Sequence, residues 1–155
     1  MRLRRATAAD LPALEAISRE AGSAAHWSTV QWEAIFTRTA PPRLVWITEA
    51  EDGNAATGLL VALSGPEWEL ENIAVLLSAR RQGAARALLG ALVDEARAQQ
   101  AERILLEVRA SNEAAIALYK AAGFGLLGRR RDYYGNTNSG NRMEDALVMV
   151  LSLAG

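Results

Sequence analysis

Three arginines and a glycine gather where an apolar stretch gives way to an Ala/Leu-rich segment, within residues 69–89. Arg80, Arg81 and Arg86 stand at the expected N-terminus of a helix, where unpaired N–H groups and the helix dipole disfavour cations unless an anion lies nearby. Gly83 has no side chain, so a phosphate can approach the backbone closely. On this stretch alone, an anion cradle and an amphipathic surface helix with solvated arginines are equally supported.

A carboxylate, Glu107, stands inside the short apolar strand expected at residues 103–108. Alternation places it on one face with Leu105 and Arg109. Burying a carboxylate is costly unless it is paired or used in chemistry. The two explanations are an ion pair with Arg109 or Arg103, and a role in proton transfer.

Asn112 and Tyr119 lie seven positions apart and therefore share one helix face. In isolation, Asn112 is explained as a helix N-cap and Tyr119 as a core aromatic. However, the anion cradle, Glu107 and this helix belong to consecutive strand–helix units. Such units bring their residues together at the carboxyl ends of neighbouring parallel strands, where ligands usually bind.

Hydrophobic periodicity predicts the elements that must position these residues. Strands are expected at 3–7, 43–50, 57–64, 67–75, 103–108, 124–134 and 145–153, and helices at 11–21, 30–38, 83–99 and 116–122. The helix at 11–21 is expected to be capped by residues 8–10, and Gly123 to close the last helix. The order β-α-α-β-β-β-α-β-α-β-β predicts an α/β fold with a mixed sheet, in a single domain over residues 1–155.

Composition narrows the class of protein. Half of the 155 residues are hydrophobic, 23% are charged and the net charge is -1, which suits a soluble globular protein and argues against a dedicated nucleic-acid binder. The absence of cysteine excludes disulfides, thiolate metal sites and a cysteine nucleophile, and the single His26 leaves no histidine cluster for a metal. No apolar run reaches the ~20 residues of a membrane span, so no membrane association and a cytoplasmic location are expected.

The motif IAV followed by RRQGAARALL, and then LLEVRASNEAAIALYKAAGF, resembles the acetyl-CoA core of the GNAT N-acetyltransferases. The Arg/Gln-x-x-Gly-x-Gly/Ala signature of that family is present at residues 80–85. The LEVRASN segment, the ALY-x-x-x-GF run and RRDYY with its closing ED-A strand resemble one branch, the RimI-type ribosomal-protein N-terminal alanine acetyltransferases. The close match covers residues 72–151, and Trp27-Ser28 is similar to the branch more weakly.

The resemblance implies specific roles for residues of this chain. Glu107 matches the general base, Tyr119 the general acid, and Asn112 an asparagine that contacts CoA. The acetyl and pantetheine arm would lie along backbone groups of Ile73, Ala74 and Val75. The pyrophosphate would lie over the segment Arg81, Gln82, Gly83, Ala84, Ala85 and Arg86.

The implied reaction is direct transfer of acetyl from acetyl-CoA to the α-amine of a protein, with a small-subunit ribosomal protein that begins with Ala as the expected acceptor and no metal involved. Two alternatives are a GNAT enzyme for small amines or broad protein N-termini, and a non-catalytic acyl-CoA sensor. Glu71 and Glu69 rival Glu107 as the base. The oligomeric state is not determined by the sequence.

The chain departs from the branch at three places. Residues 76–79 replace a usual Asp-Pro-x-Tyr, so this link is expected to pack differently. His26 stands where the branch tends to carry Pro, and the loop at 135–143 is longer than is typical. The last two places are where the resemblance puts the peptide acceptor, so the acceptor must be read from the regions where the sequence departs most from the family.

Overall fold

A computed structural model describes residues 1–21, 27–37, 43–51, 55–134 and 144–153. Within these ranges the chain forms seven strands, four α-helices and two short 3-10 helices in the predicted order. The elements are β1 Arg2–Arg5, η1 Ala8–Asp10, α1 Leu11–Glu20, α2 Thr29–Ile35, β2 Arg43–Glu49, β3 Ala56–Leu63, β4 Glu67–Val75, η2 Leu77–Ala79, α3 Ala84–Ala98, β5 Arg103–Arg109, α4 Glu113–Ala121, β6 Gly125–Tyr134 and β7 Glu144–Ser152.

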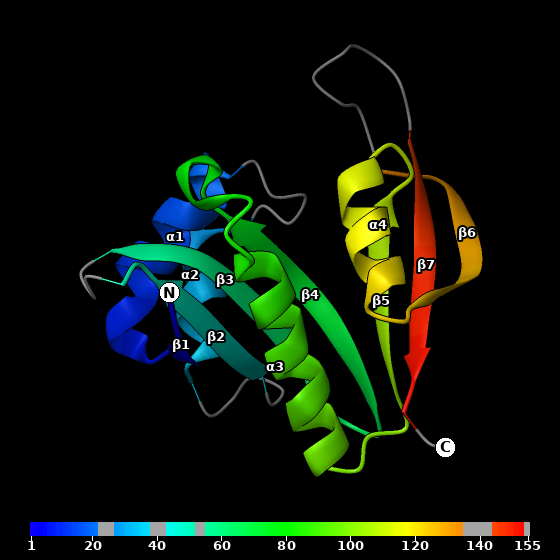
Figure 1. Ribbon diagram of the computed structural model, residues 1–155, viewed down its shortest axis with the longest axis horizontal. Coiled ribbons are helices and arrows are strands. Elements are labelled where there is room, and N and C mark those ends of the chain that lie inside the picture. Colours follow the sequence, from blue (N-terminus) through cyan, green and yellow to red (C-terminus); the bar gives the residue numbers. More distant parts are fainter. Residues whose placement is uncertain (22–26, 38–42, 52–54, 135–143, 154–155) are drawn as a thin grey trace.

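The strands form one mixed sheet in the order β1-β2-β3-β4-β5-β7-β6. Neighbours pair antiparallel except β4 and β5, which are parallel. Helices α1 and α2 cover one face, whereas α3 and α4 cover the other (Figure 1). The predicted α/β fold with a mixed sheet is confirmed.

Strand β2 shows why two helical layers are needed. Leu44 and Trp46 pack into the cluster that contains α3, and Val45 and Ile47 pack into the cluster that contains α1 and α2. Successive side chains of a strand point to opposite faces, so a strand that is apolar on both faces requires cover on both.

Strand β4 carries a bulge at Glu71, since Val61 of β3 pairs with Asn72 while Ala62 pairs with Leu70. The extra residue shifts the alternation of side chains. Trp68 and Leu70 before the bulge, and Ile73 and Val75 after it, all pack on the α3 side. Glu69 consequently faces the α1–α2 side, and so does Ala74 beyond the bulge.

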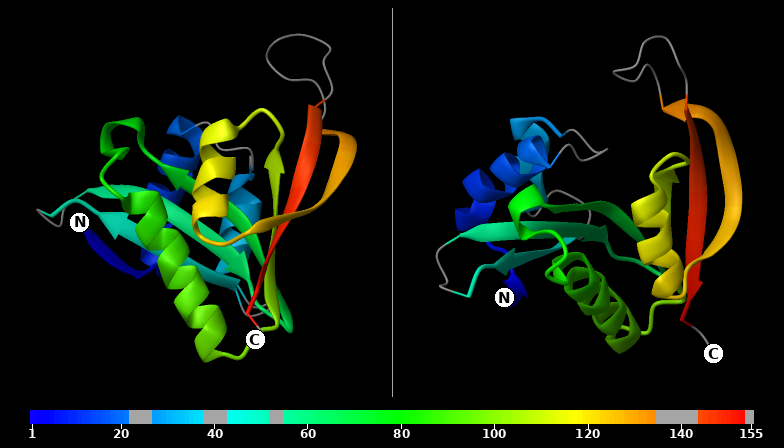
Figure 2. Two further views of the ribbon diagram at one scale, coloured as in Figure 1. Left: turned by 45° about the vertical axis from the view of Figure 1, so that its right-hand side comes forward. Right: turned by 45° about the horizontal axis from the view of Figure 1, so that its top comes forward.

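Strands β4 and β5 are paired over only four residues, Glu67–Leu70 against Arg103–Leu106. Beyond this point the two strands diverge, and the β5-β7-β6 half of the sheet turns away from the rest (Figures 1 and 2). The divergence opens the sheet at the carboxyl ends of its two parallel strands. This is where sequence reasoning placed the ligand.

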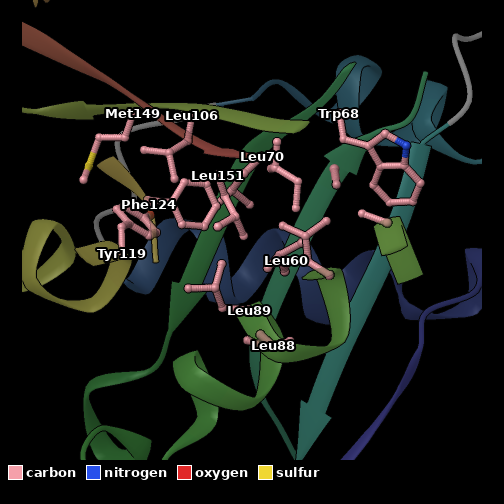
Figure 3. Packing of buried hydrophobic residues seen from close by; sticks show 14 of the residues in the cluster. Leu60, Trp68, Leu70, Leu88, Leu89, Leu106, Tyr119, Phe124, Met149 and Leu151 are labelled. Atoms are coloured by element: carbon pink, nitrogen blue, oxygen red, sulfur yellow. The ribbon is translucent and has the colours of Figure 1, made fainter. Parts of the chain in front are cut away.

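Helix α4 is fixed to the sheet by a compact aromatic and aliphatic cluster. The rings of Tyr119 and Phe124 lie 5.9 Å apart between centroids, close to Leu106, Met149 and Leu151 (Figure 3). Gly123 adopts a φ of +104° and closes the helix, as predicted. The position of Tyr119 therefore follows from core packing.

Several local predictions are wrong in detail. Strand β1 ends at Arg5. Asp10 is the N-cap residue of α1, within the predicted 8–10, but its side chain makes no cap hydrogen bond to α1 and forms a capping box with Thr7 around η1. Helix α2 begins at Thr29 after the Ser28 cap and ends at Ile35. Strand β5 was expected to be buried on both faces, but only its residues Ile104, Leu106 and Val108 are buried, because no described helix packs on its other face.

Candidate active site

A cavity of about 760 Å³ occupies the gap between the diverging strands. Ala85 of α3 and Leu118 and Tyr119 of α4 line it from one side of the sheet. Carboxylates of β4 and β5 line it from the other side, together with Trp27, whose ring lies 4.9 Å from that of buried Trp32. The cavity therefore passes through the sheet, and two ligands can reach its middle from opposite faces.

A second cavity of about 400 Å³ adjoins the first and surrounds the N-terminus of α3. We call it the cationic end, because Arg80, Arg81 and Arg86 line it together with Gly83. Arg81 and Gly83 take φ angles of +66° and +81°, and a Cβ atom on Gly83 would meet no atom within 4 Å. The turn thus leaves open space directly before the first unpaired N–H groups of the helix.

The cationic end has the chemistry of a phosphate site. Among the described residues, neither Arg81 nor Arg86 forms an ion pair, and the Arg80 guanidinium donates to the backbone oxygen of Val75 over 3.4 Å. Uncompensated arginines beside a helix N-terminus favour an anion. The residues present therefore fit the pyrophosphate of a CoA thioester.

Asn112 lies at the start of α4 on the wall of the larger cavity. Its Oδ1 atom accepts from the Ala115 N–H over 3.1 Å, which confirms the N-cap interpretation. The preceding turn is held by Glu144, which accepts from the backbone N–H of Ser111 over 2.9 Å, from the Ser111 hydroxyl, and from Arg109 over 3.2 Å. These contacts lower the pKa of Glu144, and the hydrogen bond from the Ser111 hydroxyl has the largest effect.

The opposite wall, which we call the acidic end, carries Glu69, Glu71 and Glu107. Arg130 of β6 donates to Oε1 of Glu107 over 2.7 Å, and 28% of the Glu107 side chain remains exposed. The expected partners were wrong, because Arg109 pairs with Glu144 and Arg103 pairs with Glu67. Glu107 is thus half-buried and paired.

Glu71 is held by Arg43 of β2, which donates over 2.6 Å to Oε1 and over 3.2 Å to Oε2. Glu69 forms no ion pair with any described residue, although it lies between the other two carboxylates. Desolvation raises the pKa of Glu69 most, the negative charges of Glu71 and Glu107 raise it further, and Arg43 lowers it. Among the described residues, arginines therefore pair with two of the three carboxylates of the acidic end.

The structure brings together nearly all of the predicted site residues. The larger cavity is lined by Ile73, Ala74, Val75, Ala85, Glu107, Asn112 and Tyr119, and the cationic end by Arg81, Gly83, Ala84, Ala85 and Arg86. Gln82 lines neither cavity. The link at residues 76–79 contains η2, whereas His26 and the loop at 135–143 lie outside the described residues.

Sequence reasoning missed Arg43, Arg130 and Tyr133. The two arginines lie 28 and 23 residues from the carboxylates they contact, and no local pattern joins them. Tyr133 lines the larger cavity, and the guanidinium of Arg130 stacks over its ring at 3.8 Å. The only available signal was the RRDYY motif, which carries both Arg130 and Tyr133.

Within the described ranges, no group of three or more His, Cys, Asp and Glu side chains is arranged to hold a metal ion. No helix in the same ranges is long and apolar enough to span a membrane.

Comparison with known proteins agrees with this geometry. The acetyltransferase (GNAT) family model matches residues 10–124. The chain is 38% identical over 145 residues to the [ribosomal protein bS18]-alanine N-acetyltransferase of Escherichia coli K12. The alignment covers 94% of this chain and 93% of that protein. The family model covers the cationic end and the three carboxylates of the acidic end, and it ends before Arg130.

Solved structures give the same result. The crystal structure of the E. coli ribosomal-protein-S18-alanine N-acetyltransferase superposes with a TM-score of 0.87 at 34% identity, over 99% of this chain and 94% of that one. A ribosomal-protein-alanine N-acetyltransferase from Brucella melitensis gives 0.83 at 29% identity, over 99% and 100%. The chain therefore belongs to the acetyltransferase (GNAT) family and is an acetyl-CoA-dependent N-acetyltransferase.

Proposed function

We propose that the protein transfers an acetyl group from acetyl-CoA to the N-terminal α-amine of a protein, and that its acceptor is a ribosomal protein beginning with Ala. The observation that carries the proposal is the 38% identity to the E. coli bS18-alanine N-acetyltransferase over almost the full length of both chains. The two-sided cavity supports it, because a donor and a peptide can approach from opposite faces of the sheet.

The cationic end holds the donor. Arg81, Arg86 and the first N–H groups of α3 bind the pyrophosphate, and Asn112 contacts the same ligand farther along the cavity. Beyond Leu70, β4 has no partner strand on its β5 side. Its N–H groups that point to that side therefore face the cavity, where they can stabilise a developing oxyanion.

Acetyl-CoA supplies an activated thioester, and the side chains move the protons. An α-amine has a pKa near 8 and is mostly protonated at neutral pH, so it must lose a proton before or during attack on the thioester carbonyl. Glu107 accepts that proton, directly or through a water. Its Oε2 atom carries no hydrogen bond to a described residue, since Arg130 engages Oε1.

Tyr119 completes the proton balance. As the new C–N bond forms and the C–S bond breaks, the leaving thiolate takes a proton from the Tyr119 hydroxyl, because tyrosine is protonated at neutral pH. The ring is 5% exposed and packed against Phe124, so its orientation is fixed. The chain contains no cysteine to carry an acetyl thioester, so transfer is direct within a ternary complex.

The test compares acceptors under saturating acetyl-CoA. CoA release is measured with short peptides that differ at their first two residues, and with polyamines and aminoglycosides. The highest kcat/KM is expected for peptides that begin with Ala. Preference for the small amines would contradict a protein acceptor, and binding of acetyl-CoA without transfer to any acceptor would indicate a sensor.

A further inference from the structure

The charges at the acidic end do not balance. Arg130 neutralises Glu107 and Arg43 neutralises Glu71, whereas Glu69 forms no ion pair with a described residue. Glu69 nevertheless stays accessible at the wall of the cavity. Within the part of the chain that the structure describes, one carboxylate is thus left without an ion pair at the side of the cavity from which the acceptor approaches.

The register of the sheet locates Glu69 relative to the reacting amine. Glu69 pairs with Leu105, and Glu107 lies two residues farther along the same face of β5. Two residues of a strand span roughly 6.6 Å, and neighbouring strands lie about 4.8 Å apart. The Cα atoms of Glu69 and Glu107 are therefore roughly 8 Å apart. When the amine of an extended peptide is at Glu107, its second and third residues are within reach of Glu69.

We infer that Glu69 selects acceptor peptides that carry a positive charge at the second or third residue, an inference that rests on the proposed function. A lysine or arginine there supplies a cation that can pair with Glu69. An acidic residue at the same place adds a fourth carboxylate to Glu69, Glu71 and Glu107. The preference is therefore electrostatic and decreases with added salt.

The raised pKa of Glu69 agrees with this assignment. Desolvation and the charges of Glu71 and Glu107 disfavour its ionised form, and Arg43 is the only side chain that opposes this effect among those that shift its pKa. A peptide cation beside Glu69 relieves the same repulsion. Binding of a basic acceptor consequently stabilises the ionised carboxylate.

The experiment uses peptides that all begin with Ala and carry Lys, Gln or Glu at the second position, with a parallel set changed at the third. The ratio of kcat/KM values for Lys and Gln peptides is measured for the unmodified protein, for Glu69→Gln and for Glu67→Gln. Glu67 is the matched control, because it belongs to the same strand but pairs with Arg103 outside the cavity. A ratio within one variant cancels any general loss of activity or folding.

For the unmodified protein and for Glu67→Gln, kcat/KM at low salt is expected to be about fivefold higher for the Lys peptide than for the Gln peptide in at least one of the two sets. A preference of this size is typical of a partly exposed ion pair. For Glu69→Gln the ratio falls to about one. An unchanged ratio in Glu69→Gln, an equal fall in Glu67→Gln, or no preference in the unmodified protein would overturn the inference alone. Failure to acetylate any peptide would overturn the proposed function, and the inference with it.

Discussion

The cationic end is lined by small and apolar residues and by three arginines that form no ion pair with a described residue, whereas at the acidic end arginines from distant strands hold two of three carboxylates. The cationic end comes from one continuous segment, residues 75–86, together with Leu118. The acidic end is assembled from β2, β4, β5 and β6. A common donor can be bound by a local motif, but recognition of an acceptor requires long-range contacts that differ between proteins.

The largest effect is expected at the acidic end. Glu107→Gln removes the proposed proton acceptor and should lower kcat by about 10²–10⁴-fold, with little change in the Kd of acetyl-CoA, because the cationic end is untouched. Steady-state kinetics over a range of pH and calorimetric titration measure the two quantities. Glu71→Gln is the matched comparison and should keep most of its activity. An active Glu107→Gln beside an inactive Glu71→Gln would reverse the assignment of the base.

Tyr119→Phe should lower kcat by about 10²-fold, because the hydroxyl that is the proposed proton donor is lost. The ring remains and keeps its contact with Phe124, so thermal unfolding should shift little. Kinetics and calorimetric unfolding on the same preparation separate the two effects. A variant with normal kcat would exclude Tyr119 as the acid.

At the cationic end, Gly83→Val should weaken acetyl-CoA binding by about tenfold, because the side chain enters the open space before α3. The positive φ of Gly83 also disfavours a β-branched residue, at a cost of about 1–3 kcal/mol in the free energy of unfolding.

Gly90→Ala is the control for this change. Gly90 lies inside α3 and is exposed, and a Cβ atom there meets no atom within 4 Å, so this variant should gain about 0.5–1 kcal/mol of stability. Chemical denaturation and acetyl-CoA titration check both variants. Unchanged donor affinity in Gly83→Val would place the pyrophosphate elsewhere.

The smallest effect concerns Glu144, which holds the turn before Asn112. Its pKa is lowered from the ordinary value of 4.5, so its contacts stabilise the fold above about pH 4.5 and are lost as the pH falls through the lowered value. Glu144→Gln should therefore lose about 1 kcal/mol at pH 7 and less at pH 3. Urea unfolding at the two pH values tests this, and an equal loss at both would show that ionisation of Glu144 is irrelevant.

The sequence predicted the cationic end well because its information is local. The spacing of Arg80, Gly83 and Arg86 at a helix start is sufficient for an anion cradle, and α3 begins one residue after Gly83. The acidic end was predicted less well. The partner of Glu107 was expected on β5 itself, but the contact comes from Arg130 on β6, two strands away. That neighbourhood depends on β7 lying between β5 and β6, which no local pattern specifies.

The bulge at Glu71 was missed for a related reason. Residues 67–71 alternate between glutamate and apolar side chains, as in one regular strand, and the extra residue is visible only in the pairing with β3. The bulge keeps Glu69 and Ala74 on the α1–α2 side while Ile73 and Val75 face α3. The faces of this strand could therefore not be assigned from periodicity alone.

The most direct test of direct transfer in a two-sided cavity is initial-rate kinetics in which acetyl-CoA and an Ala-initiated peptide are both varied. Both substrates must be bound together, so double-reciprocal plots should intersect, and mass spectrometry should locate the acetyl group on the α-amine. Parallel lines, or acetylation of a side chain in place of the terminus, would contradict the account.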